Sequence, residues 1–134
     1  MRIISSDYER SVDIGTSDIW HSLYSIVETR SKNFKKSIPL ALSFLKTGNS
    51  GAENALECAR QFNLIRDELS KYPPQMAVYD IDDVTKSAPW ADNISPVVTS
   101  CGNLYLTADG KDLLYEIVSI LTYAYYAEVS LLVE

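Results

Sequence analysis

The sequence predicts one α+β domain, residues 1–134, in which a small, mostly antiparallel sheet is covered by three or four helices. Apolar residues recur at helical spacing in several stretches, and short runs typical of strands lie before and between them. The length of 134 residues, with 46% hydrophobic and 22% charged residues, suits a single soluble domain with a core of its own.

The first elements are a hairpin and a helix. Residues 2–4 predict a short strand, which residues 11–15 are expected to join as a hairpin partner. A helix is predicted in the stretch 15–30, because Thr16 or Ser17 can accept backbone hydrogen bonds as N-cap and Asp18 complements the helix dipole. Its apolar face consists of Ile19, Leu23, Ile26 and Val27.

The stretch 37–48 fits two patterns. A strand is suggested by the alternation of Ile38, Leu40, Leu42 and Phe44, and a helix by the spacing of Ile38, Ala41, Leu42 and Leu45. A helical or mixed conformation is preferred.

The stretch 50–72 predicts a helix more plainly. Ser50 and Glu53 have the S-x-x-E spacing of a capping box, in which each side chain binds the other residue's free backbone N–H. Tyr72-Pro73-Pro74 is expected to end the helix.

The C-terminal half predicts two more strands and a last helix. Residues 76–81 and 103–106 are the strands, and residues 84–102 are a loop between them. Thr107 or Asp109 is expected to cap a helix that starts near Lys111, continues into the 120s and covers the sheet. Its apolar face would be Leu114, Ile117, Val118, Leu121 and Ala124.

Charge and cysteine content limit the possible binding partners of the protein and the cellular compartment in which it is expected. The net charge of −6 argues against direct nucleic-acid binding and is compatible with a basic protein partner. Cys58 and Cys101 have no motif spacing, which favours free thiols in a reducing cytosol, and the N-terminus lacks a secretory signal. Glu116 and Glu128 interrupt the apolar stretch 113–133, which therefore predicts a core helix and no membrane contact. A cytoplasmic protein is expected.

The sequence predicts no catalytic, cofactor or metal site. His21 is the only histidine, and nothing places a cysteine or serine beside it, so we expect a surface or cap residue. A zinc site usually needs three or four ligands, and one histidine with two separated cysteines argues against one. The sequence "GNSG" lacks the lysine of a phosphate loop, and "DIDD" at 80–83 lacks the rest of a calcium loop. We therefore expect a protein that is not an enzyme.

Residues 63–124 combine several features in a characteristic order. A Pro-Pro pair follows a helix, then come an apolar run with an acidic end, a Pro-Trp-x-Asp-Asn-Ile-Ser loop and the sequence Thr-x-Asp-Gly-Lys-Asp-Leu. The clearest of these residues are Pro73, Pro74, Asp80, Pro89, Trp90, Asp92, Asn93 and Gly110. The arrangement resembles the immunity protein 70 family of bacterial polymorphic toxin systems, which includes immunity proteins of contact-dependent growth inhibition.

The resemblance implies an α+β inhibitor that binds the C-terminal domain of a cognate toxin in the cytosol. Such toxins are often nucleases, whose phosphate-binding surfaces are basic, so an acidic inhibitor has the complementary charge. The candidate toxin-binding carboxylates are Asp80, Asp82, Asp83 and Asp92. Asp109 and Asp112 are weaker candidates, because capping the last helix would also explain them.

Trp90 is the fifth candidate toxin-binding residue, and it has two interpretations. As a plug, it would cover the ends of the strands, with its indole N–H bound to a carbonyl. As an anchor, it would enter a pocket on the toxin. The plug is preferred, because the motif around Trp90 is what the family shares.

Two other functions stay open. A small cytosolic regulatory or adaptor domain is the rival, since Tyr123, Tyr125 and Tyr126 in the apolar tail could form a self-association surface. A hydrolase would need a pair of carboxylates that the sequence does not identify.

Overall fold

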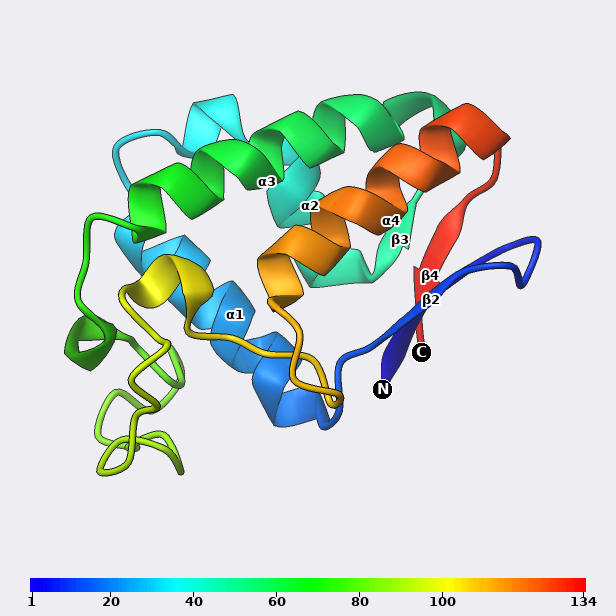
Figure 1. Ribbon diagram of the computed structural model, residues 1–134. Helices are drawn as coiled ribbons and strands as arrows, with labels where there is room; N and C mark the ends of the chain where they lie inside the picture. The colour runs from blue at the N-terminus through cyan, green and yellow to red at the C-terminus, as the bar shows by residue number, and fades with distance from the viewer.

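A computed structural model describes residues 1–134. Its sheet has four antiparallel strands: β1 (Arg2–Ser5), β2 (Ser11–Asp13), β3 (Asn49–Ser50) and β4 (Leu131–Val133). The strand order is β2-β1-β4-β3, and Ile3 of β1 lies opposite Val12 on one side and Val133 on the other. The two ends of the chain therefore lie side by side (Figure 1). The predicted N-terminal hairpin is confirmed.

The four helices are α1 (Ser17–Arg30), α2 (Pro39–Thr47), α3 (Ala55–Leu69) and α4 (Leu113–Ala127). The ambiguous stretch 37–48 is thus mostly helical. Pro39 occupies the first turn of α2, where its missing N–H costs nothing, and Gly48 ends the helix in the left-handed conformation with φ 71°. The α+β class and the number of helices agree with the prediction.

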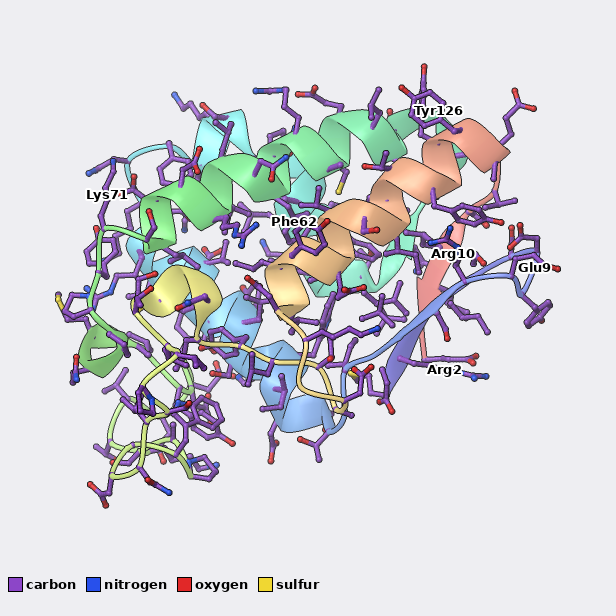
Figure 2. The ribbon with its side chains drawn as sticks, viewed as in Figure 1. Arg2, Glu9, Arg10, Phe62, Lys71 and Tyr126 are labelled. Atoms are coloured by element: carbon purple, nitrogen blue, oxygen red, sulfur yellow. The ribbon has the colours of Figure 1, made fainter.

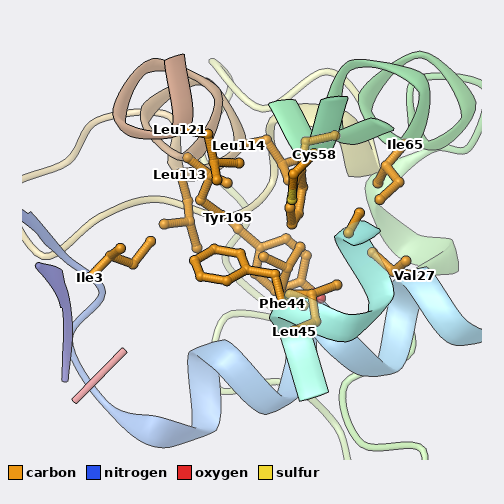
Figure 3. Packing of buried hydrophobic residues seen from close by; sticks show 14 of the residues in the cluster. Ile3, Val27, Phe44, Leu45, Cys58, Ile65, Tyr105, Leu113, Leu114 and Leu121 are labelled. Carbon is orange, nitrogen blue, oxygen red and sulfur yellow. The ribbon is translucent and has the colours of Figure 1, made fainter. Parts of the chain in front are cut away.

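One hydrophobic core holds these layers together. Phe44 of α2 packs edge to face against Phe62 of α3 at a centroid distance of 6.2 Å. Leu45 of α2, Cys58 of α3 and Leu113 of α4 belong to the same core cluster (Figure 3). The α2 helix contacts both α1 and α3, and α3 and α4 lie side by side (Figure 1). The last helix was expected to cover the sheet. Instead, α4 packs chiefly against α3, although it also contacts β2.

The predicted strand over 76–81 is wrong. Residues Pro74–Met76 form a 3₁₀ turn, and the chain beyond it is irregular. The backbone hydrogen bonds explain the difference: the N–H of Ile81 donates to Ser25 Oγ of α1 at 3.0 Å, and the N–H of Asp82 donates to Asp80 Oδ1 at 2.9 Å. These donors bind side chains and so do not form a strand ladder.

The predicted strand over 103–106 is also wrong. Residues Cys101–Asn103 form a 3₁₀ turn, and only Leu106 makes an isolated bridge, to Asp112. The Ser100 hydroxyl accepts the N–H of Gly102 at 3.0 Å, while the Asn103 side chain accepts the N–H of Ser100 at 3.1 Å. This reciprocal capping satisfies the backbone locally.

The helix caps differ from those predicted. Ser50 belongs to β3, and α3 begins only at Ala55 after a 3₁₀ turn, so the Ser50–Glu53 capping box is absent. The last helix is capped by Asp112 and not by Thr107 or Asp109, because Asp112 Oδ1 accepts the N–H of Tyr115 at 3.3 Å.

We expect Asp112→Ala to lower the free energy of unfolding by about 1–2 kcal/mol, because it removes both the cap of α4 and an ion pair. Arg66 Nη2 of α3 lies 2.8 Å from Asp112 Oδ2. Urea unfolding of the variant measures the loss. Asp112→Asn is the matched control, since asparagine also caps helices, and it should lose less than alanine does. Equal losses would contradict the capping role.

Candidate functional site

Residues 77–100 are the most unusual part of the molecule, since they form neither helix nor strand. Stretches this long without regular structure are uncommon in compact domains and are usually either functional loops or linkers. The segment projects at the lower left of Figure 1, coloured green to yellow, away from the sheet. All five predicted toxin-binding residues lie in it, and we call residues 77–100 the acidic segment.

The acidic segment carries half of the protein's net charge. It contains Asp80, Asp82, Asp83 and Asp92 and one base, Lys86, which gives −4 + 1 = −3 against −6 for the whole chain. By contrast, residues 17–48 contain two acids and five bases and carry +3. The molecule is therefore electrostatically polarised along its sequence.

Both ends of the acidic segment are fixed to the body. Before its start, Arg30 Nη2 donates to the carbonyl oxygen of Met76 at 2.7 Å, and its guanidinium lies over the ring of Tyr72 at 5.2 Å. Just after its end, the N–H of Cys101 donates to the carbonyl oxygen of Tyr72 at 2.9 Å. The segment thus leaves and re-enters the body at neighbouring points.

Asp80 ties the acidic segment to α1. Its side chain is only 15% exposed, and its Oδ1 lies 2.9 Å from Nε2 of His21, while Lys86 Nζ lies 3.6 Å from Oδ2. The hydrogen bond from His21 is the main cause that lowers the pKa of Asp80 below its usual value, followed by the N–H of Asp82. Asp80 therefore acts in the structure as an ionised anchor.

Asp82 contacts the same histidine from the solvent-exposed side. Its Oδ2 lies 3.2 Å from His21 Nε2, and its side chain is 81% exposed. Sequence reasoning missed His21 as a partner of these carboxylates, and it also missed Ser25, whose hydroxyl accepts the N–H of Ile81. His21 and Ser25 are four residues apart, hence on one helix face, which is the signal that could have indicated a shared polar contact.

Asp83 and Asp92 are the free part of the acidic segment. Asp83 Oδ1 accepts hydrogen bonds only from Thr85, at 3.2 Å from its N–H and 2.6 Å from its hydroxyl, as in an Asx turn. Asp92 is exposed and has neither a side-chain hydrogen bond nor an ion pair. Both carboxylates are accessible to a partner without breaking contacts to the body.

Trp90 is half-buried and packs onto the core. Its ring meets those of Tyr79 and Tyr105 edge to face, at centroid distances of 5.6 and 6.0 Å. Tyr105 is itself fixed, because its hydroxyl lies 2.8 Å from Ser22 Oγ, and burial raises its pKa. The plug interpretation was wrong in two details: no strand ends lie beneath Trp90, and its indole N–H has no carbonyl acceptor.

A mostly apolar pocket of about 230 Å³ opens beside Trp90. It is lined by Ile19, Trp90, Asn93, Ile94, Ser95, Val98, Leu104, Tyr105 and Leu106. The acidic segment thus offers carboxylates and an apolar hollow together, a combination found at protein–protein interfaces.

The remaining candidates lie outside this surface. Asp112 caps α4. The side chain of Asp109 accepts a hydrogen bond from the Thr107 hydroxyl, and its Oδ2 lies 3.5 Å from Lys111 Nζ. The structure thus uses both in local contacts. In the C-terminal stretch, the hydroxyl of Tyr123 donates to Asp7 at 2.5 Å, whereas Tyr126 is 73% exposed.

The two cysteines are free and buried in the core. Burial raises the pKa of Cys58 to about 12, and that of Cys101 is also raised, by the same cause. Because the thiolate is the reactive form, burial disfavours reaction of these thiols at neutral pH.

The fold and this segment define a small α+β protein that presents a fixed, acidic loop surface. A family model, "Immunity protein 70", matches residues 4–133, and the chain belongs to this family of immunity proteins of toxin systems. The match extends well beyond residues 63–124, where the resemblance was recognised. Membership implies a cognate toxin as partner and a non-enzymatic inhibitory role. Neither the curated proteins nor the solved structures give a match. None of the helices has the length and apolar character needed to span a bilayer.

Proposed function

We propose that this protein neutralises its toxin in the cytoplasm by covering a basic, nucleic-acid-binding surface of the toxin's C-terminal domain with the acidic segment. The toxin in this proposal is a nuclease delivered by contact-dependent growth inhibition. The carboxylates of Asp82, Asp83 and Asp92 take the places where substrate phosphates would bind lysine and arginine.

The observation that carries the proposal is that one segment is both strongly acidic and held in place by contacts with the body. Residues 77–100 carry −3, yet Asp80 and Trp90 hold them against the body. A surface that is already in its binding conformation loses less conformational entropy when a partner binds. Net negative charge on a mobile loop would give attraction without this benefit.

An interface of ordinary size would need more than the carboxylates. Stable complexes bury about 1,600 Å² in total, with an apolar centre and a polar rim. The pocket beside Trp90 supplies such a centre, because it is mostly apolar and adjoins the charged residues in sequence. We expect an apolar side chain of the toxin to enter it.

The proposal is tested with the toxin domain encoded beside this protein. We expect the two to co-purify as a complex and the protein to protect cells that express the toxin domain. In vitro, purified toxin domain should cleave nucleic acid, and an equimolar amount of this protein should stop cleavage and nucleic-acid binding together. Binding without loss of nucleic-acid contact would place the interface elsewhere, and no binding would refute the proposal.

A further inference from the structure

Three potential metal ligands from two distant parts of the chain meet at one point. His21 lies in α1, and Asp80 and Asp82 lie 59 and 61 residues later, yet one ligand atom of each falls within 4.8 Å of the other two. His21 Nε2 is 2.9 Å from Asp80 Oδ1 and 3.2 Å from Asp82 Oδ2.

Hydrogen bonding to His21 alone does not satisfy both carboxylates of this cluster. Nε2 of an imidazole carries at most one proton, so it can make a full hydrogen bond to only one of the two carboxylates. Lys86 is the only lysine or arginine that pairs with either carboxylate, and it faces the far oxygen of Asp80, Oδ2, at 3.6 Å. Apart from the histidine, the two carboxylates and the one ammonium sum to a charge of −1, and Asp82 has no lysine or arginine partner.

We propose that His21, Asp80 and Asp82 bind a divalent transition-metal cation of the Zn²⁺ type. Zn²⁺ binds imidazole nitrogen and carboxylate oxygen at about 2.0–2.2 Å, which places neighbouring tetrahedral ligands about 3.4 Å apart. The two observed distances from Nε2 are slightly shorter, so the ligands need to separate by only a few tenths of an ångström. The larger of the two separations, between His21 Nε2 and Asp80 Oδ1, needs a small rotation of the His21 side chain, which is 40% exposed. The exposed Asp82 side chain can make the other movement.

The surroundings of the cluster favour the same assignment. Asp80 Oδ1 accepts the N–H of Asp82 at 2.9 Å, which orients the carboxylate and leaves a second lone pair for the metal. Metal binding would release the proton from Nε2 of His21 if that nitrogen carries it. Three protein ligands leave one tetrahedral position open to solvent.

A cation at this point would bind α1 to the acidic segment and would reduce the charge of that segment from −3 to −1. This inference departs from the sequence-based expectation of no metal site. It does not depend on the proposed toxin inhibition, because all of its readouts use the free protein.

The test is a titration of the full chain, without a histidine tag, with Zn²⁺ and separately with Mg²⁺. Because His21 is the only histidine, its imidazole gives a single set of histidine signals in a two-dimensional NMR spectrum. We expect one equivalent of Zn²⁺ to shift these signals and to raise the melting temperature, with no effect of Mg²⁺. Unmoved signals in excess Zn²⁺ would overturn the proposal.

Two neighbouring substitutions provide the matched comparison. Asp82→Asn should weaken Zn²⁺ binding by about tenfold or more, whereas Asp83→Asn, with the same charge change one residue away, should leave it unchanged. Asp82 is exposed, so its variant is expected to fold normally. Equal affinity in the two variants would mean that the carboxylates are not ligands, and the site would be refuted.

Discussion

The triple variant Asp82→Asn, Asp83→Asn, Asp92→Asn is expected to associate with the toxin domain about 10- to 100-fold more slowly at low salt than the parent protein. The physical reason is electrostatic steering: the parent segment carries −3, and the variant segment carries none of that charge. Stopped-flow or surface-based kinetics measure the association rate directly. Its dependence on ionic strength should also become weaker.

A second triple variant separates local charge from total charge. Glu9→Gln, Glu53→Gln, Glu128→Gln removes the same three charges from exposed positions. Glu9 lies in the hairpin turn and Glu128 at the end of α4, on the far side of the molecule from the acidic segment (Figures 1 and 2). We expect a much smaller change in rate for this control. Equal slowing in both variants would show that only the net charge matters.

The stability of the triple variant should remain close to that of the parent. The side chains of Asp83 and Asp92 make no hydrogen bond or ion pair with the body. Asp82→Asn weakens only an exposed contact with His21, and Asp80 keeps its own bond to His21. Exposed substitutions of this kind usually change the free energy of unfolding by less than about 0.5 kcal/mol. A slower association is thus attributable to the surface.

Trp90→Ala is expected to lower the free energy of unfolding by about 2–3 kcal/mol, below the range for fully buried tryptophan because Trp90 is half-buried. The loss comes from its edge-to-face contacts with Tyr79 and Tyr105, which join the acidic segment to the core. Trp90→Phe should retain part of this packing and lose less. Thermal or urea unfolding, with toxin affinity measured in parallel, tests the prediction.

Val84→Ala is the matched control for Trp90 within the same segment. Val84 is 78% exposed, so its truncation should leave stability nearly unchanged. An unchanged melting temperature of Trp90→Ala, together with weakened toxin binding, would reverse the assignment and make Trp90 an interface anchor.

The comparison of sequence with structure shows which patterns are informative. The helices at 17–30, 55–69 and 113–127 were predictable, because an apolar stripe at helical spacing is a local signal that tertiary packing reinforces. The strands at 76–81 and 103–106 were predicted wrongly from short apolar runs bounded by turn residues. There, Asp80, Ser100 and Asn103 offer side-chain partners to the backbone, and these compete with a sheet ladder.

The strands β3 and β4 show the opposite case. Asn49 and Ser50 carry no strand signal, and Leu131–Val133 was read as part of an apolar tail. They pair because the chain returns to place β4 between β1 and β3, with Leu132 opposite both Ile4 and Asn49. Partners so far apart in sequence leave no trace in a local pattern.

The sequence by itself determined the fold class, three of the four helices, the family and the concentration of acidic residues in 77–100, since all of these depend on composition, spacing or motif. Only the tertiary structure decided the order of the strands, the packing of Trp90 against two tyrosines, and the contacts of His21 with Asp80 and Asp82. Those features are contacts between residues far apart along the chain, and side-chain geometry fixes them only after the core has packed.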